Sequence, residues 1–148
     1  MAMPPALQLT SGLAAVLLWL LLEAFAARVL GQLLVAVARP RWLPPMEAWF
    51  SGLLAYPILL TVQVVLILAM ATIALGVGTG WPVPVTPGAS VGGALVASAY
   101  AYAATMVLRY AVRMSRRPDQ RWFGGTIPIV FHLVLAAWLF VLGSYLVS

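Results

Sequence analysis

The sequence predicts an all-α integral membrane protein with four transmembrane helices, arranged as two related helical hairpins. Of the 148 residues, 64% are hydrophobic and only 7% are charged, and the mean hydropathy is +1.06. A water-soluble domain would carry about 25% charged residues. Four apolar blocks are each long enough for a membrane span, which needs about 20 residues. All eight basic residues are arginines, and seven of them gather at one end of these blocks.

The four blocks are residues 9–38, 53–76, 93–112 and 127–147. The first is longer than one perpendicular span requires, because about 30 residues extend ~45 Å against a hydrocarbon core of ~30 Å. We therefore expect this helix to tilt or to project beyond the membrane. The stretch 77–92 is rich in proline and glycine, so it is predicted to be a linker with Trp81 at the interface. The chain, 1–148, is expected to form one domain with hairpins at about 7–76 and 93–148.

The arginines predict the orientation of the chain. Seven of the eight lie at or just beyond the ends of the first and third blocks, whereas the two termini and the 77–92 linker carry no charged side chain. The positive-inside rule places the arginine loops in the cytoplasm and both termini outside, in a cell inner membrane. Arginines beside apolar spans also attract anionic lipid headgroups, so the net charge of +5 needs no nucleic acid to explain it. The residues assigned to headgroups are Arg39, Arg41, Arg113, Arg116, Arg117 and Arg121.

A short motif occurs twice, about half of the chain apart. The matching residues are Pro45, Trp49, Phe50 and Gly52 in the first copy and Pro118, Trp122, Phe123 and Gly125 in the second. An acid follows each proline, where a helix dipole favours negative charge. We predict two short interfacial helical turns on the cytoplasmic side, with their aromatic rings at headgroup level. Duplication would relate the hairpins by a pseudo-two-fold axis along the membrane normal, and convergence on a membrane re-entry motif stays open.

Few polar side chains fall within the blocks, and an ionisable group at that depth is by default a functional hypothesis. The candidates for an intramembrane ligand or proton site are Glu23, Arg28, Gln63, Tyr100, Tyr102, Arg109 and His132, with Gln32 beyond Arg28. Tyr100 and Tyr102 are two apart and point to different faces, so at most one of them joins a single pocket. Together these residues predict an internal polar layer.

Glu23 is the sharpest of these candidates. Glu23 and Arg28 are five apart, about 140° around a helix, so they do not form a favourable pair along one helix face. We expect Glu23 to turn to another helix, in a structural hydrogen bond, as the protonation site of a carrier, or at an interface with another subunit. A single glutamate in the first helix is similar to that of small four-helix multidrug carriers. The resemblance covers this one residue and not the patterns of their second and third helices.

His132 is the only histidine, and the chain has no cysteine. The usual haem and zinc sites need further ligands, so a metal site at His132 requires a partner chain. No nucleophile motif, phosphate loop or paired carboxylates occur. We therefore expect a non-catalytic accessory or structural subunit that packs against a larger membrane complex, or against itself and lipid. The alternatives are a proton-coupled small-molecule carrier using Glu23, and an intramembrane enzyme or metal site at His132. No cofactor is assigned.

Overall fold

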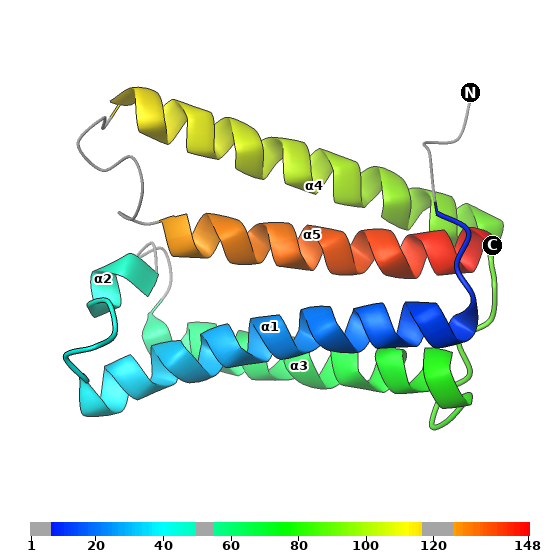
Figure 1. Cartoon of the computed structure of the whole chain (residues 1–148), viewed down its shortest axis with the longest axis horizontal. Coiled ribbons are helices and arrows are strands. Elements are labelled where there is room, and N and C mark those ends of the chain that lie inside the picture. The colour runs from blue at the N-terminus through cyan, green and yellow to red at the C-terminus, as the bar shows by residue number, and fades with distance from the viewer. Residues whose placement is uncertain (1–6, 50–54, 117–125) are drawn as a thin grey trace.

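The computed structural model describes residues 7–49, 55–116 and 126–148, and these residues form helices and connecting segments. The helices are α1 (Ser11–Ala38), α2 (Met46–Trp49), α3 (Tyr56–Thr79), α4 (Ala89–Arg116) and α5 (Thr126–Val147) (Figure 1). All except α2 are long and apolar enough to cross a membrane. The prediction of an all-helical protein with four helices long and apolar enough to span a membrane is thus confirmed for the described residues.

The helix ends follow local chemistry. The Thr10 hydroxyl caps α1 by accepting a 3.3 Å hydrogen bond from the Leu13 main-chain N–H, which satisfies one free donor of the first turn. At the other end of α1, Arg39 adopts a left-handed conformation with φ 46°. Pro57 lies in the first turn of α3, where its missing N–H costs nothing, and Gly80 ends that helix with φ 74°. α4 extends beyond the predicted block at both ends, so the connection between α3 and α4 is shorter than expected.

The long helices contact one another in the order α3, α1, α5, α4. α1 therefore lies between α3 and α5, and α5 lies between α1 and α4 (Figure 1). The expected two-fold axis would exchange α1 with α4 and α3 with α5. The contact between α1 and α5 would then have a counterpart between α4 and α3. Within the described residues, the backbones of α3 and α4 do not approach each other in this way.

The tightest helix contact joins α4 to α5. A Cβ atom added to Gly92 would lie 2.8 Å from the main-chain oxygen of Gly143, and one added to Gly143 would lie 2.9 Å from the main-chain oxygen of Gly92. Only glycine at both positions allows the two backbones to come this close, as small residues do in many membrane helix pairs. Val96 and Ala99 continue the buried face of α4 along the same contact.

The hydrophobic core lies between α1, α3 and α5. Its buried members include Leu18, Met70, Ala74, Trp138 and Leu142. The segment before α1 is joined to the end of α5, because the Leu9 N–H donates a 3.1 Å hydrogen bond to the Ser148 hydroxyl. Both described chain ends thus lie at one end of the helices, here called the terminal end (Figure 1). The opposite end, here called the arginine end, holds α2 and the last turn of α4.

Candidate functional site

A hydrogen-bonded cluster of three buried polar side chains lies within the apolar helices. Arg28 and Gln32 are four apart on α1 and so share one face of that helix. Arg28 Nη1 donates a 2.8 Å hydrogen bond to Gln32 Oε1, and Gln63 Nε2 of α3 donates to the same oxygen at 3.2 Å. The exposed fractions are 7% for Arg28, 0% for Gln32 and 5% for Gln63. This cluster links α1 to α3 through polar groups.

The same arginine also holds α2. Arg28 Nη2 donates a 2.6 Å hydrogen bond to the main-chain oxygen of Trp49, and the Trp49 indole N–H donates to the Pro44 oxygen at 3.0 Å. The Trp49 ring is buried and lies against Gly31, where an added Cβ would come within 2.8 Å of the ring. We expected this ring at headgroup level, and in the structure it packs on α1. The headgroup role of its motif therefore stays a prediction.

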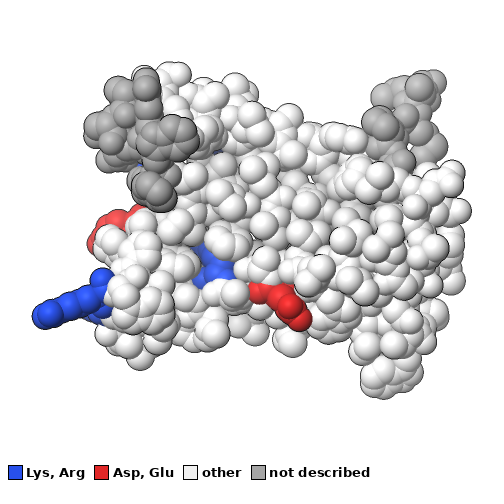
Figure 2. Space-filling model, in the orientation of Figure 1, with Lys and Arg blue, Asp and Glu red and all other residues white. Residues whose placement is uncertain are grey.

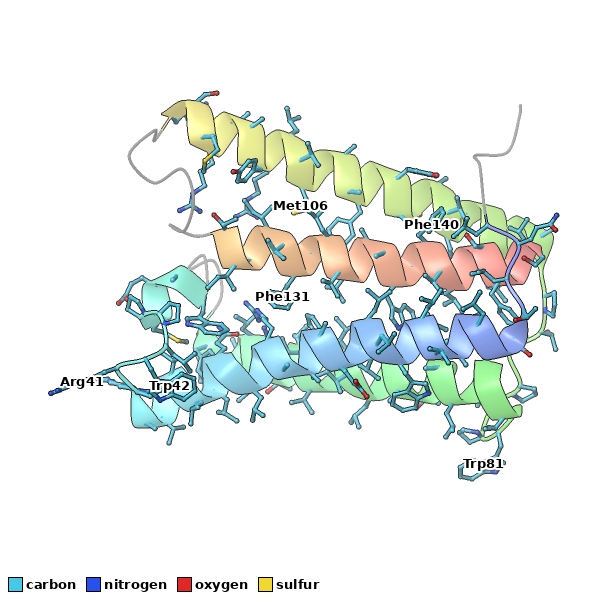
Figure 3. The ribbon with its side chains drawn as sticks, in the orientation of Figure 1. Arg41, Trp42, Trp81, Met106, Phe131 and Phe140 are labelled. Atoms are coloured by element: carbon cyan, nitrogen blue, oxygen red, sulfur yellow. The ribbon has the colours of Figure 1, made fainter. Side chains whose placement is uncertain are left out.

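A cavity of about 180 Å³ lies beside the cluster, between α1, α3 and α5. Arg28, Gln63 and His132 supply its polar lining, and the remaining lining residues are apolar. Phe131 projects from α5 towards α1 (Figure 3), and the guanidinium carbon of Arg28 lies 6.0 Å from the centre of its ring. That distance is at the limit of a favourable cation–π contact.

Some polar atoms of the cluster have no hydrogen-bond partner among the described residues. They are Arg28 Nε, Gln32 Nε2 and Gln63 Oε1, all buried. The acids of the described segments are Glu23 and Glu47, and neither forms an ion pair with Arg28. The positive charge of Arg28 is therefore surrounded by neutral dipoles and an aromatic ring. Buried polar groups in proteins are normally paired, so these atoms call for an explanation.

A second polar contact joins α4 to α5. The Tyr102 hydroxyl and His132 Nδ1 share a short hydrogen bond, and the two rings meet edge to face with centroids 5.7 Å apart. Tyr100 makes a different contact from α4. Its ring and the Phe140 ring of α5 are arranged edge to face, with their centroids 5.6 Å apart. The two tyrosines thus make different contacts, and only Tyr102 is connected to the cavity, through His132.

Glu23 lies apart from all of these groups. It is exposed on the outward side of α1, near the midpoint of the helix. In Figure 2, a patch of acidic atoms and a smaller patch of basic atoms lie close to each other on the largely uncharged surface over the helices. Of the predicted polar residues, the Arg28, Gln32 and Gln63 cluster and the Tyr102 and His132 pair meet at the same cavity, because His132 lines it. Glu23 lies on the outside of α1, and Arg109 is exposed on α4.

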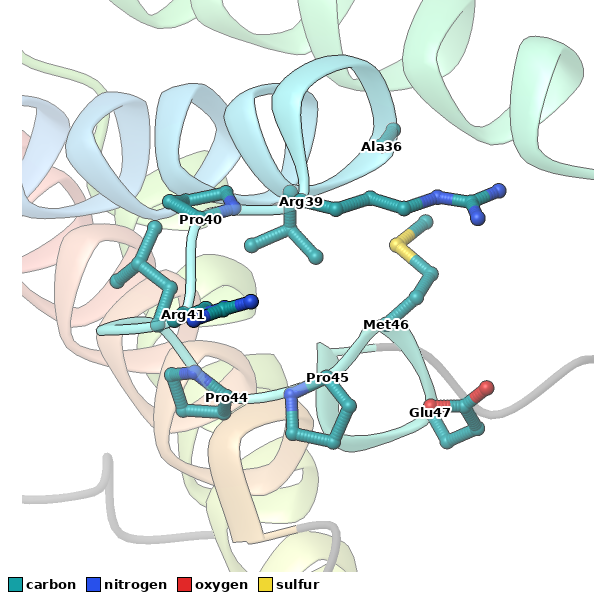
Figure 4. A pocket seen from close by; sticks show the side chains of 10 residues that line it. Ala36, Arg39, Pro40, Arg41, Pro44, Pro45, Met46 and Glu47 are labelled. Atoms are coloured by element: carbon teal, nitrogen blue, oxygen red, sulfur yellow. The ribbon is translucent and has the colours of Figure 1, made fainter.

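The interfacial arginines can be placed in part. Arg39 and Arg41 are exposed on the loop between α1 and α2, around a hollow of about 610 Å³ that Glu47 also lines (Figure 4). The charged side chains around this hollow are exposed. It therefore differs from the cavity lined by Arg28, Gln63 and His132, here called the Arg28 cavity, whose polar groups include buried ones. Arg113 is half-buried and Arg116 exposed near the end of α4. The remaining predicted residues, Phe50, Gly52, Arg117, Pro118, Arg121, Trp122, Phe123 and Gly125, lie outside the described residues.

The sequence predicted some features of this cluster and not others. Arg28, Gln32 and Gln63 were all named from the sequence, but their mutual hydrogen bonds, with Gln32 Oε1 as the shared acceptor, and the bond to the Trp49 main-chain oxygen were not foreseen. The spacing of Arg28 and Gln32 was the available signal, because residues four apart lie on one helix face. The described residues contain no group of three histidine, cysteine or acidic side chains that could hold a metal ion.

Comparison of the chain with protein-family models, with curated proteins and with solved structures gives no match. Its function is therefore inferred from the residues themselves.

Proposed function

We propose that this chain is a non-catalytic membrane subunit that packs through the outward side of α1 against a transmembrane helix of another chain. It serves as an accessory or structural component of a membrane assembly, either with a larger complex or with its own copies. The observation that supports this proposal is the exposed position of Glu23 near the middle of a membrane helix.

An acidic side chain is costly to place in hydrocarbon. On insertion scales, an ionised acid at the centre of a membrane helix costs about 2.5–3.5 kcal/mol. Such groups normally face the bundle interior or a polar partner. Glu23 faces neither within the described residues, so a helix from another chain is the natural source of its hydrogen-bond partner. Interhelical hydrogen bonds of this kind contribute about 1–2 kcal/mol in model peptides.

The face around Glu23 has a shape suited to a second helix. Exposed residues recur on it at alternating intervals of four and three, which is the spacing that lets two helices pack side by side at a small crossing angle. They are Val16, Leu20, Glu23, Ala27, Leu30, Leu34 and Val37. We call these seven residues the α1 stripe. Apolar residues alone would suit lipid equally well, and it is the carboxyl group in their midst that favours a protein partner.

A proton-coupled carrier is less well supported. Its carboxyl group would be expected to line the substrate cavity, whereas Glu23 is not among the residues that line the Arg28 cavity. That cavity, at about 180 Å³, is also smaller than the roughly 300–1,000 Å³ typical of small-molecule sites.

The orientation and lipid contacts belong to the same proposal. The arginine end faces the cytoplasm, with Arg39, Arg41 and Arg116 near anionic headgroups of an inner membrane, because short arginine-bearing loops are retained on that side. The two copies of the Trp-Phe motif derive from duplication of a helical hairpin. The sequence match supports that origin, and the second copy lies outside the described residues.

The proposal is tested by the size of the purified assembly in mild detergent, measured by light scattering and native mass spectrometry. Glu23→Gln keeps a hydrogen-bonding group of similar size and should leave the assembly intact. Glu23→Leu should raise its dissociation constant on the order of tenfold, as loss of one interhelical hydrogen bond implies. Glu47→Leu, which removes an exposed acid from α2, serves as the control. An assembly unaffected by Glu23→Leu would contradict the proposal, as would proton-driven uptake into proteoliposomes that Glu23→Gln abolishes.

A further inference from the structure

We propose that the Arg28 cavity binds the headgroup of an anionic phospholipid, with a hydrocarbon chain leaving between α3 and α5. The site belongs to this chain alone, and it is separate from both the α1 stripe and the exposed arginines of the arginine end. Its chemistry is a phosphate oxygen for Arg28 together with a hydroxyl donor for Gln63.

The first reason is the charge of Arg28. Its side chain is 93% buried, lines the cavity and has no acid beside it among the described residues. Removing a guanidinium from water is costly unless an anion and hydrogen bonds compensate for it. The two terminal nitrogens have neutral acceptors, on Gln32 and Trp49, whereas Nε has none. A phosphate oxygen would satisfy Nε and balance the charge, and arginine is well suited to such a partner.

The second reason is the unpaired oxygen of Gln63. Gln63 Nε2 is used in the bond to Gln32, so Oε1 is left as a buried acceptor without a partner, on a residue that lines the cavity. A bare carboxylate offers it no proton. A phosphate monoester with a P–OH group, or a phosphate followed by a glycerol hydroxyl, carries both the anionic oxygen and the donor. This requirement favours phosphatidic acid or phosphatidylglycerol over a fatty acid.

The third reason is the form of the cavity. Its volume of about 180 Å³ holds a phosphate and the first atoms attached to it, but not a whole lipid. The rest of its lining is apolar, with Phe25, Leu59, Leu66 and Leu135 around the polar groups. The backbones of α3 and α5 do not come together within the described segments, and Val62 on the rim is 53% exposed. Because Val62 both lines the cavity and is exposed, the cavity reaches the surface at this residue, and we place the exit of the hydrocarbon chain there.

A purely structural role accounts for only part of these observations. Arg28 does fasten α2 and α3 to α1, and that role uses Nη1 and Nη2. It leaves Arg28 Nε, Gln63 Oε1 and the cavity between them unexplained. A carboxylate from another polypeptide would balance the charge equally well, but it would supply no proton to Gln63.

The experiment measures lipid binding by native mass spectrometry of the full chain in mild detergent. The probes are dioleoyl phosphatidic acid, dioleoyl phosphatidylglycerol, dioleoyl phosphatidylcholine and oleate. Val62→Trp fills the rim while leaving Arg28 and every other arginine in place. Val65→Trp makes the same substitution three residues away, at a position that is 61% exposed and does not line the cavity. Arg28→Gln removes the charge.

Wild type and Val65→Trp should each retain one anionic phospholipid on the order of tenfold more tightly than phosphatidylcholine. Val62→Trp and Arg28→Gln should lose this tightly bound lipid and keep only the weaker preference for anionic headgroups that the exposed arginines confer. The proposal is overturned by equal binding of all phospholipids to the wild type, or by a preference on the order of tenfold that survives Val62→Trp, which would place the tight site on the exposed arginines. Tight binding of oleate alone also overturns it, as does capture of another polypeptide instead of lipid by a photo-crosslinker at position 62 in native membranes.

Discussion

Arg28 donates its 2.6 Å hydrogen bond to the main-chain oxygen of Trp49 across 21 positions of sequence, and so fastens α2 to the interior of the long helices. The bond points a buried guanidinium towards the arginine end, where α2 folds back over α1. One side chain thus connects the polar cluster, the cavity and the short helix. The integrity of all three should respond to changes on the face of α1 that carries Arg28.

Gly31 provides the space that the Trp49 ring occupies. An added methyl group would lie 2.8 Å from that ring, so Gly31→Ala should displace the ring and loosen α2. We expect the free energy of unfolding to fall by about 1–3 kcal/mol, the range typical of overpacking. Gly12→Ala on the same helix meets nothing within 4 Å and should cause no loss. Unfolding in a denaturing detergent measures both, and equal stability of the two variants would contradict the packing described.

The crossing of α4 and α5 depends on Gly143. Gly143→Ala would place a Cβ 2.9 Å from the main-chain oxygen of Gly92 and from Val96 of α4, so the helices would have to separate. The same unfolding assay should report a loss of about 1–3 kcal/mol. Gly88→Ala is a suitable control, because an added Cβ there meets nothing within 4 Å. If Gly143→Ala and Gly88→Ala unfolded alike, the close approach would be wrong.

Tyr102 and His132 should be energetically coupled. Tyr102→Phe removes one hydrogen bond and should lower the free energy of unfolding by about 0.5–1.5 kcal/mol. In a His132→Phe background, Tyr102→Phe should lower the free energy of unfolding very little. The losses caused by the two single substitutions should therefore not add in the double variant. Tyr145→Phe, which affects a hydrogen bond to Val85 at the terminal end, should add to the His132 substitution. Simple additivity for Tyr102 and His132 would mean that their contact contributes nothing.

The predicted orientation can be checked with single cysteines, since the chain has none of its own. Cysteines at Thr86 and Ser148 should react with an impermeant reagent added outside, because both positions lie towards the terminal end. A cysteine at Ser115 should react only after permeabilisation. Reaction of Ser115 from outside in intact cells would reverse the orientation, and accessibility of all three from one side would contradict four membrane spans.

The sequence was most informative where no knowledge of packing was needed. An apolar run of about 20 residues predicts a membrane helix by itself, so the four long helices could be predicted with small errors at their ends. The direction in which each polar side chain points could not be predicted in the same way. Helices that are hydrophobic on all sides do not reveal which side meets a neighbour. Glu23 could therefore be placed at the right depth but not on the outward side of α1, and Gln63 could not be paired with Gln32.

Trp49 illustrates a second limit. Its motif indicated a short helical turn, and α2 is a helical turn. The direction of the ring depends on Gly31, 18 positions earlier, which leaves a gap on α1 that the ring fills. A contact of this kind depends on how two elements are placed in space, and a composition typical of interfaces carries no information about it.

The central claim is that a helix of another chain covers the α1 stripe at Glu23, and photo-crosslinking in native membranes tests it most directly. A photoreactive residue at Ala27, one turn from Glu23 on the α1 stripe, should give a discrete protein adduct in the wild-type and Glu23→Gln backgrounds. The yield of that adduct should fall clearly with Glu23→Leu, as a dissociation constant raised on the order of tenfold implies, and the same photoreactive residue at Val65 on α3 should give no adduct. If Ala27 yields no more protein adduct than Val65, or if the yield at Ala27 is unchanged by Glu23→Leu, then no helix is held at Glu23 and the proposed function is wrong.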